Sequence, residues 1–295
     1  MDIRQTNLWS NYLQKLGWEA EKLSQDYFAY SRRISFFGSV IKIPRIPLPI
    51  PFKEIDKFAK NKNAFIVKLE PMVERSDAKV DQLRSSLKSS GFSEDRWALN
   101  PTATIQIDLT KPEETLLKEM DKDTRYNIHL AERKGVTVKE TNNLNQFKQL
   151  FYETGKRKGF WIPKKELEEI WGIFSKENSG FILTAFYQNQ PIASTILLTN
   201  NKMALYYHAA SLNIHREVMA PYLLLWESMK FLKKKGVGTF DLEGVRDPRF
   251  PSTKKWGGFT LFKKGFGGRE VVYLGSFVKY YKLWAKLLFL PTRFF

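Results

Sequence analysis

The sequence predicts a mixed α+β fold, and two observations carry this prediction. Three apolar strands at residues 181–187, 191–199 and 203–210 follow one another closely, and the turn at Asn189 and Gln190 is typical of a β-hairpin. Segments with helical spacing precede and follow this antiparallel meander, so helices and strands are mixed along the chain. With 295 residues, 43% of them hydrophobic, the chain can bury the core of one large or two medium domains.

The remaining elements follow from apolar spacing and from the glycines and prolines between them. Before residue 110, helices are expected at 7–18, 52–60 and 76–90, and strands at 26–35, 64–69 and 102–109. A single helix is expected at 111–134, because proline and two acids occupy its first turn and Gly135 follows its end. Helices at 144–159 and 164–176 precede the meander, and one at 221–235 leads into a strand at 239–243.

A short internal sequence repeat indicates a duplication. Phe58-Ala59-Lys60 precedes Leu69-Glu70, and Phe231-Leu232-Lys233 precedes Leu242-Glu243, at the same separation. Both sets belong to a helix followed by a strand, and both helices begin near a proline. Two related domains are therefore expected.

Charge and composition restrict the classes of partner and chemistry. The chain has 48 Lys and Arg against 31 Asp and Glu, a net charge of +17 that attracts phosphate-bearing partners and anionic membranes. It has no cysteine, which excludes disulfides, thiolate zinc sites and a cysteine nucleophile. Its three histidines are scattered, which argues against a metal site. No apolar stretch suits a signal peptide or a membrane span, so we expect a cytoplasmic protein that rests at most on the inner face of the plasma membrane.

Three stretches carry a resemblance to a known family. Residues 121–136 form a basic helical pattern, and residues 220–227 lead on to a second stretch ending at 245. The third, residues 257–268, reads Gly-Gly-Phe-Thr-Leu-Phe-Lys-Lys-Gly-Phe-Gly-Gly and is the most specific. In their order and spacing these stretches resemble the FemABX family of peptidoglycan interpeptide-bridge aminoacyltransferases, over residues 102–275.

The resemblance implies a fold and a reaction. It implies two tandem acetyltransferase-like (GNAT-like) domains, which we place at 1–105 with 276–295 and at 106–275, with a C-terminal helix that returns to the first domain. It also implies aminoacyl-tRNA as donor and a lipid-linked or UDP-linked muropeptide as acceptor, with an amino acid of the Gly, Ala or Ser class transferred. The extended helical arm of the longer family members is missing here, as it is in the short members.

No cofactor is expected. A GNAT enzyme holds the coenzyme A pyrophosphate on a glycine-rich turn before the helix that follows its central hairpin. In this chain that turn, residues 211–221, contains no glycine. The glycines at Gly236 and Gly238 follow a helix and are typical of a helix C-cap rather than a phosphate loop.

The strongest catalytic candidate is Lys263, with Lys264 and Phe262 beside it in the third stretch. An ammonium at this place would stabilise the tetrahedral oxyanion or the departing ribose oxygen of an ester donor. Phe262 would pack against the acceptor or the terminal adenosine. From residue types alone, a solvated basic hairpin tip is the alternative, and the family resemblance favours the functional interpretation.

Carboxylates supply the candidates for handling the acceptor amine, which must lose a proton before it attacks. Asp241 and Glu243 share a strand face by two-residue alternation, and either could accept that proton. A structural salt bridge is an equal alternative. Asp108, at the end of its strand, is a weaker candidate for the same task.

Further substrate-binding candidates lie near the end of the third meander strand and on a basic helix. Tyr206 and Tyr207 could bind a peptide or phosphate, although strand tyrosines are also common in cores, and Arg216 could pair with a pyrophosphate. Arg125 and Arg133, with His129 between them, form a basic stripe at four-residue steps that suits a tRNA acceptor stem or a muropeptide pyrophosphate. A solvated helix face is the alternative for this stripe.

The C-terminal segment, residues 277–295, mixes aromatic and aliphatic residues with basic ones, and it is expected to be a helix that docks on the first domain, contacts a membrane interface, or does both.

Two other functions stay open. One is an N-acyltransferase that uses an acyl thioester, or a tRNA-dependent transferase acting on protein N-termini. The other is a non-catalytic protein that binds RNA or membranes.

Overall fold

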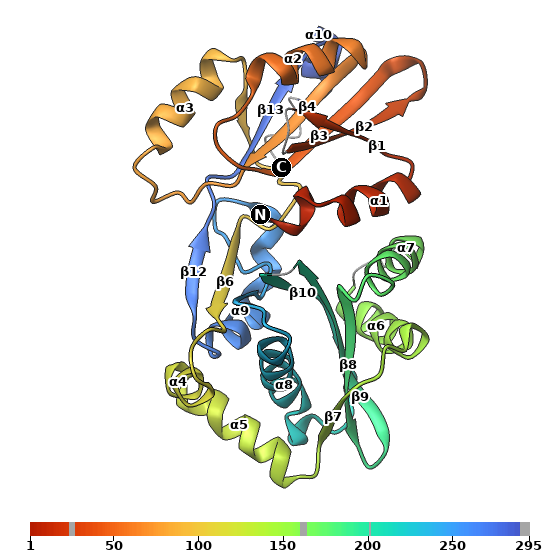
Figure 1. Cartoon of the computed structure of the whole chain (residues 1–295), viewed down its shortest axis with the longest axis vertical. Coiled ribbons are helices and arrows are strands. Elements are labelled where there is room, and N and C mark those ends of the chain that lie inside the picture. The colour runs from red at the N-terminus through yellow and green to blue at the C-terminus, as the bar shows by residue number, and fades with distance from the viewer. Residues whose placement is uncertain (24–26, 160–163, 201, 290–295) are drawn as a thin grey trace. The chain divides into compact units, whose positions relative to one another are not determined.

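The computed structural model in Figure 1 describes residues 1–23, 27–159, 164–200 and 202–289, and it confirms the mixed α+β class. The chain divides into two compact units. Unit 1 comprises residues 1–103, 244–257 and 271–295, and unit 2 comprises residues 104–243 and 258–270. None of the helices in the described part of the chain has both the length and the apolar character that a bilayer crossing requires.

Unit 1 is built on a six-stranded sheet with the order β1-β2-β3-β4-β13-β5. Its strands are β1 (Glu19–Leu23), β2 (Tyr27–Ile34), β3 (Gly38–Ile46), β4 (Ala64–Pro71), β5 (Ser93–Asp95) and β13 (Ser276–Tyr280). Its helices are α1 (Asn7–Lys15), α2 (Phe52–Asn61), α3 (Val80–Ser89) and α10 (Leu283–Phe289). Alternate residues of the central strands, such as Ile41 and Val67, form a buried core with Phe58 of α2 and Leu87 of α3.

Unit 2 is built on a seven-stranded sheet with the order β12-β6-β11-β10-β9-β8-β7. Its strands are β6 (Ala103–Asp108), β7 (Thr137–Glu140), β8 (Gly180–Tyr187), β9 (Gln190–Asn200), β10 (Met203–Ser211), β11 (Thr239–Asp241) and β12 (Arg269–Val272). Its helices are α4 (Glu113–Glu119), α5 (Lys122–Arg133), α6 (Leu144–Lys158), α7 (Lys164–Phe174), α8 (Ala220–Lys234) and α9 (Gly257–Lys264). The strands β8, β9 and β10 pair antiparallel, which confirms the predicted meander.

The two units share one arrangement, as the internal sequence repeat predicts. In unit 1, β3 and β4 pair parallel and α2 connects them; in unit 2, β10 and β11 pair parallel and α8 connects them. Parallel strands require such a crossover connection. The residues of the internal repeat occupy matching places in the two units. Glu70 at the end of β4 therefore corresponds to Glu243 just after β11.

Several sequence predictions are wrong in detail. The strands β1 and β3 lie in segments where no strand is predicted. The helix expected at 111–134 is two helices, because Met120 and Asp121 are extended and the Asp121 N–H bonds the Gly265 carbonyl oxygen at 2.9 Å. Here a tertiary contact overrides local helix propensity.

The C-terminal segment also differs from its prediction. Residues 276–280 form strand β13, and only α10 is helical among the described residues; residues 290–295 lie outside them. Both elements belong to unit 1, so the expected return to the first domain is confirmed.

The predicted domain division places residues 244–257 and 271–275 in the second domain, whereas their contacts place them in unit 1. The Val245 N–H bonds the Ala103 carbonyl oxygen at 2.9 Å, and Thr102 donates its hydroxyl to Asp247 at 2.7 Å. The Arg249 guanidinium also donates to the carbonyl oxygen of Tyr273 at 2.8 Å. These bonds link segments far apart in sequence, so local pattern does not reveal them.

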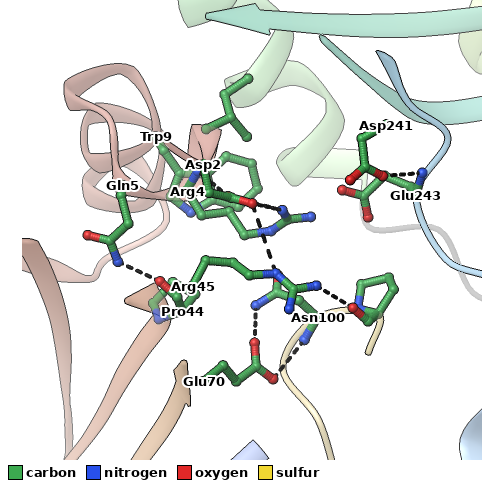
Figure 2. Close-up of polar contacts among 12 residues, drawn as sticks. Asp2, Arg4, Gln5, Trp9, Pro44, Arg45, Glu70, Asn100, Asp241 and Glu243 are labelled. Carbon is green, nitrogen blue, oxygen red and sulfur yellow. Dashed lines mark hydrogen bonds and ion pairs between the residues drawn. The ribbon is translucent and has the colours of Figure 1, made fainter. Parts of the chain in front are cut away.

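Glu70 is a polar anchor of unit 1. Its buried carboxylate accepts hydrogen bonds from the Leu99 N–H at 2.6 Å, the Asn100 N–H at 3.2 Å and the Asn100 side-chain amide at 2.6 Å. Figure 2 shows Glu70 and Asn100 facing each other. A carboxylate bonded to several N–H donors fixes the backbone that carries them.

We expect Glu70→Ala to destabilise unit 1 by about 3 kcal/mol, since buried donors would lose their acceptor. Glu70→Gln should lose less, because its carbonyl oxygen still accepts. Urea denaturation followed by circular dichroism measures both. The matched control is Glu54→Ala on the exposed face of α2, and a Glu70→Ala variant as stable as this control would contradict the anchor role.

Candidate active site

Lys263 lies in the last turn of α9 and is only 8% exposed. Its Nζ donates a hydrogen bond to the backbone carbonyl oxygen of Glu243 at 3.1 Å and lies 5.0 Å from the centre of the Phe259 ring. Burial removes water from an ammonium group and disfavours its charged form, so nearby acceptors and negative charge are needed to keep it charged.

Burial lowers the pKa of Lys263 to about 8, and the negative charges of Glu243 and Asp241 oppose this effect. At neutral pH the group is therefore still mostly protonated, but it loses its proton far more easily than an ordinary lysine. Perturbed groups of this kind are frequent at catalytic sites.

Asp241 ends strand β11 and is held by three donors. Its carboxylate accepts from the Thr104 hydroxyl at 2.5 Å, the Gln106 side-chain amide at 3.1 Å and the Glu243 N–H at 2.8 Å. Gln106 is placed by the register of β6 against β11, where it lies opposite Asp241. Burial, and then the nearby Glu243 charge, raises the pKa of Asp241 to about 6.

Glu243 adopts a left-handed backbone conformation with φ of 59°. Strand β11 ends at Asp241, so the predicted two-residue alternation does not place Glu243. Its left-handed backbone instead directs its N–H to Asp241 and its carbonyl oxygen to Lys263. Such backbone is uncommon for a residue with a side chain and is found often at functional sites. Figure 2 shows the side chains of Asp241 and Glu243 close together.

Unit 2 therefore brings together the three predicted catalytic residues: one buried ammonium, one buried carboxylate and one half-buried carboxylate. When all three are ionised, their summed charge is −1. This arrangement can attract a substrate ammonium, accept a proton from it, and stabilise negative charge that develops on a neighbouring oxygen.

The two neighbours of Lys263 point away from it. The hairpin tip considered for this stretch is instead helix α9, where consecutive residues are turned by about 100°. Lys264 is exposed and pairs with Glu270 at 2.7 Å. Phe262 packs its ring 5.0 Å from Tyr222 and 5.3 Å from Phe266. Both are predicted substrate-binding residues, and these contacts give each of them a structural partner.

The glycines of the third stretch have a structural cause. Gly267 and Gly268 have φ of 75° and 82°, and a Cβ atom on either would lie 2.7 Å from a backbone oxygen, that of Glu119 or Gln106. Only glycine permits this conformation and this close approach. The turn brings the chain from α9 into β12, and thereby fixes the end of the helix that carries Lys263.

The predicted residues at the end of β10 are dispersed. Tyr206 is buried and packs edge-on against Phe240 at 6.1 Å, and burial raises its pKa above the usual range. Tyr207 is half-buried, with its ring 4.2 Å from that of His208. Arg216 is exposed in the short 3₁₀ helix Arg216–Val218. Tyr206 is thus a core residue, and we leave it out of the proposed site.

The other three predicted residues lie on β6 and α5. The Arg125 guanidinium donates to the carbonyl oxygens that end α4, including that of Leu117 at 3.4 Å, so Arg125 has a structural role as a helix cap. Arg133 lies 5.8 Å from the ring of Tyr126. Asp108 accepts from Thr110, chiefly its hydroxyl at 2.6 Å, and these bonds hold the pKa of Asp108 below its usual range.

The register places Asp108 opposite Thr239, whereas Asp241 lies opposite Gln106. Asp108 is therefore at the other end of this short ladder from the lysine–carboxylate cluster.

Sequence reasoning missed three contributors, Thr104, Gln106 and Phe259. Thr104 and Gln106 hold Asp241 across the β6–β11 pair, which joins segments more than a hundred residues apart, and no local pattern reports that register. Phe259 lies four residues before Lys263 on the same helix face. A helical interpretation of this stretch would have found it.

The model of the FemAB family matches residues 3–167 and 174–288, which is most of the chain. The chain belongs to the FemAB family. This confirms the resemblance inferred from the three stretches.

Named members of the FemAB family and solved structures agree with this assignment. The lipid II:glycine glycyltransferase of Staphylococcus haemolyticus (strain JCSC1435) is 19% identical over 370 residues, covering 94% of this chain and 87% of that protein. The corresponding enzyme of Staphylococcus epidermidis (strain ATCC 12228 / FDA PCI 1200) is 21% identical over 224 residues, and the match covers 66% of this chain and 53% of that protein. Aminoacyltransferase FemA of Staphylococcus aureus (strain COL) is 26% identical over 89 residues, 30% of this chain and 21% of FemA.

The crystal structure of FemX matches with a TM-score of 0.83 at 17% identity, covering 97% of this chain and 94% of that one. A tandem GNAT protein from the clavulanic acid pathway matches with a TM-score of 0.50 at 8% identity, over 86% of this chain and 82% of that one. At these identities the likeness concerns the fold, and it confirms the two tandem GNAT-like units.

We expect Gly268→Ala to lower stability by about 3 kcal/mol, because it combines left-handed strain with a clash against the Gln106 carbonyl oxygen. Gly236→Ala is the matched control: its φ of 79° is nearly the same, but a Cβ atom there meets nothing within 4 Å. The control should lose only about 1 kcal/mol. Urea denaturation compares the two, and equal losses would show that the close approach at Gly268 does not constrain the turn.

Proposed function

We propose that this chain transfers an aminoacyl group from aminoacyl-tRNA to a side-chain amine on the stem peptide of a peptidoglycan precursor. The named relatives support the enzyme class, an aminoacyltransferase of interpeptide-bridge synthesis. The observation that carries the proposed chemistry is the buried Lys263 ammonium beside Asp241 and Glu243. The donor, the form of the acceptor and the roles of these residues are parts of the proposal.

The reaction converts an ester to an amide. The acceptor amine, once deprotonated, attacks the ester carbonyl carbon and forms a carbon–nitrogen bond. The bond between that carbon and the ribose oxygen then breaks, and the oxygen takes up a proton to leave the free tRNA hydroxyl. The ester carries its own activation, so the step is balanced without nucleotide hydrolysis.

Lys263 stabilises the negative charge that develops during this attack. In the tetrahedral intermediate the former carbonyl oxygen is an anion, and the ribose oxygen gains charge as it departs. A cation that is already held in place stabilises either oxygen without reorganisation, and its low exposure strengthens the effect. The Glu243 carbonyl oxygen and the Phe259 ring hold the ammonium from two sides.

Glu243 receives the proton of the acceptor ammonium. Asp241 positions Glu243 by accepting its backbone N–H. The Asp241 carboxylate already accepts from Thr104, Gln106 and the Glu243 N–H, which leaves it little capacity for a substrate. Glu243 is half-buried, so its carboxylate is the more accessible of the two. The excess negative charge of the cluster attracts a cationic amine before the proton is removed.

The net charge of +17 supports tRNA as the donor and a phosphate-bearing precursor as the acceptor. Within the predicted basic stripe, Arg133 remains a candidate for phosphate contact, whereas Arg125 caps α4. Arg216 is exposed and suits a pyrophosphate or a tRNA phosphate. We propose that transfer takes place at the inner face of the membrane when the acceptor is lipid-linked.

Replacement of Lys263 should reduce transfer without unfolding the protein. We expect Lys263→Ala to lower kcat by about 100-fold or more, which is typical for loss of a group that stabilises an oxyanion. The assay follows radiolabelled glycine, alanine or serine from charged tRNA to lipid-linked and UDP-linked muropentapeptide. Lys118→Ala is the matched control: it removes an exposed lysine of α4, also in unit 2, that pairs with Glu114 at the surface, and it should keep most activity.

RNase treatment must abolish the transfer. Unchanged turnover in Lys263→Ala would exclude the assigned role. Acylation that resists RNase and requires an acyl thioester would exclude aminoacyl-tRNA as the donor and favour a GNAT-like N-acyltransferase.

The rate should depend on pH through two groups, one that must lose its proton and one that must keep it. The negative charge that attracts the acceptor amine requires Asp241, with a pKa of about 6, to be ionised, so kcat/KM should rise as pH increases through 6. Lys263, with a pKa of about 8, must be protonated, so kcat/KM should fall as pH increases through 8. Initial rates across pH 5 to 9 measure this profile, with enzyme-free ester hydrolysis subtracted at each pH.

Lys263→Arg tests the alkaline limb separately, because arginine keeps its charge above pH 8. If this variant retains activity, its alkaline limb should move upward. A limb that stays at pH 8 in the active arginine variant would assign that titration to another group.

A further inference from the structure

Two segments of unit 1 that lie far apart in sequence expose large apolar side chains. The first is the 3₁₀ turn Ser35–Phe37 between β2 and β3, where Phe36 is 82% exposed. The second is α10, where Leu283 and Leu287 are 75% and 62% exposed. The Trp284 ring connects the two segments, because it lies 5.5 Å from the Phe37 ring. We call these five side chains the apolar patch.

Contacts with β4 and α2 of unit 1 hold the apolar patch in place. The Trp284 ring also packs 5.1 Å from Phe65 of β4. Just before α10, the Tyr281 hydroxyl bonds the Asp56 carboxylate of α2, and Lys279 pairs with the same carboxylate at 2.6 Å. In Figure 1, α10 accordingly lies close to α2 at the top of the view. The exposed side chains therefore belong to an anchored surface element.

The charged residues within the two segments of the apolar patch are basic. Arg33 precedes the turn, and Lys282 and Lys286 flank the apolar residues of α10; all three are exposed. Residues 27–46 and 278–289, which include both segments, contain no Asp or Glu. An apolar surface with a cationic rim suits a bilayer interface that carries anionic headgroups.

We propose that the apolar patch binds the surface of an anionic lipid bilayer. Phe36, Leu283 and Leu287 enter the headgroup–acyl boundary, while Arg33, Lys282 and Lys286 contact lipid phosphates. A second copy of the chain fits less well, because a symmetric contact through the patch would bring two cationic rims together. The proposal stands apart from the transfer reaction, since lipid binding is measured without donor or acceptor.

Flotation with lipid vesicles tests the proposal on the full chain. Wild-type protein should float with vesicles of phosphatidylglycerol and phosphatidylcholine and bind weakly to phosphatidylcholine alone. The double variant Phe36→Ser and Leu287→Ser should bind at least about tenfold more weakly, because each removes a side chain whose burial is worth more than a factor of ten. Lys282→Gln with Lys286→Gln should bind more weakly at low salt, and its affinity should depend less on salt.

The matched control is Leu261→Ser in unit 2, which removes a leucine that is 73% exposed, against 62% for Leu287, from outside the patch. It should float like wild type. Thermal unfolding must be unchanged in the patch variants, as expected for exposed side chains. Failure of wild type to bind anionic vesicles, or equal loss in the control, overturns the proposal. A wild-type dimer that the double variant converts to a monomer also overturns it, and assigns the patch to protein association.

Discussion

The chemistry that we propose for unit 2 depends on keeping one buried ammonium, that of Lys263, charged. Lys263 is surrounded by groups that lower its hydration, and its proton is retained because a carbonyl oxygen and two carboxylates lie close to it. Each of these depends on a different part of the fold: the register of β6 against β11 holds Asp241, and the left-handed backbone of Glu243 turns its carbonyl oxygen inward. The glycine turn at Gly267 and Gly268 ends the helix that carries the lysine. A cation placed by so many constraints is prepared before substrate arrives, which is the condition for electrostatic catalysis.

The duplication shows how one position can serve two purposes. Glu70 and Glu243 follow equivalent strands, but the Glu70 carboxylate is buried and occupied by the Leu99 and Asn100 donors. Glu243 is half-buried, its backbone N–H donates to Asp241 and its carbonyl oxygen accepts from Lys263. A fully bonded carboxylate stabilises its surroundings and has little capacity left for a ligand. The equivalent position is thus a buried polar anchor in unit 1 and a half-buried residue beside the buried lysine in unit 2.

Sequence reasoning reached the fold class, the meander, the duplication and the family, because these depend on local periodicity and on a specific run of residues. It also selected Lys263, Asp241 and Glu243, although it explained the carboxylate pair by strand alternation, and the strand ends at Asp241. It failed where distant segments decide the outcome. Thr104 and Gln106 reach Asp241 only through sheet register, and the break at Asp121 depends on a bond to Gly265. Tyr206 was an ambiguous strand tyrosine until its packing against Phe240 placed it in the core.

The loop between β10 and α8 bears on the donor that we propose. His215 and Met219 adopt left-handed conformations there, with φ of 50° and 54°, although neither is glycine. Arg157 fixes the loop by donating to the Ser211 carbonyl oxygen at 2.9 Å and to the Asn213 side chain at 3.0 Å. A phosphate cradle needs backbone N–H groups that a ligand can approach closely, and glycine permits the closest approach. An aminoacyl ester on a long polyanion can instead be recognised by surface charge, so a loop without glycine is compatible with the proposed transfer from tRNA.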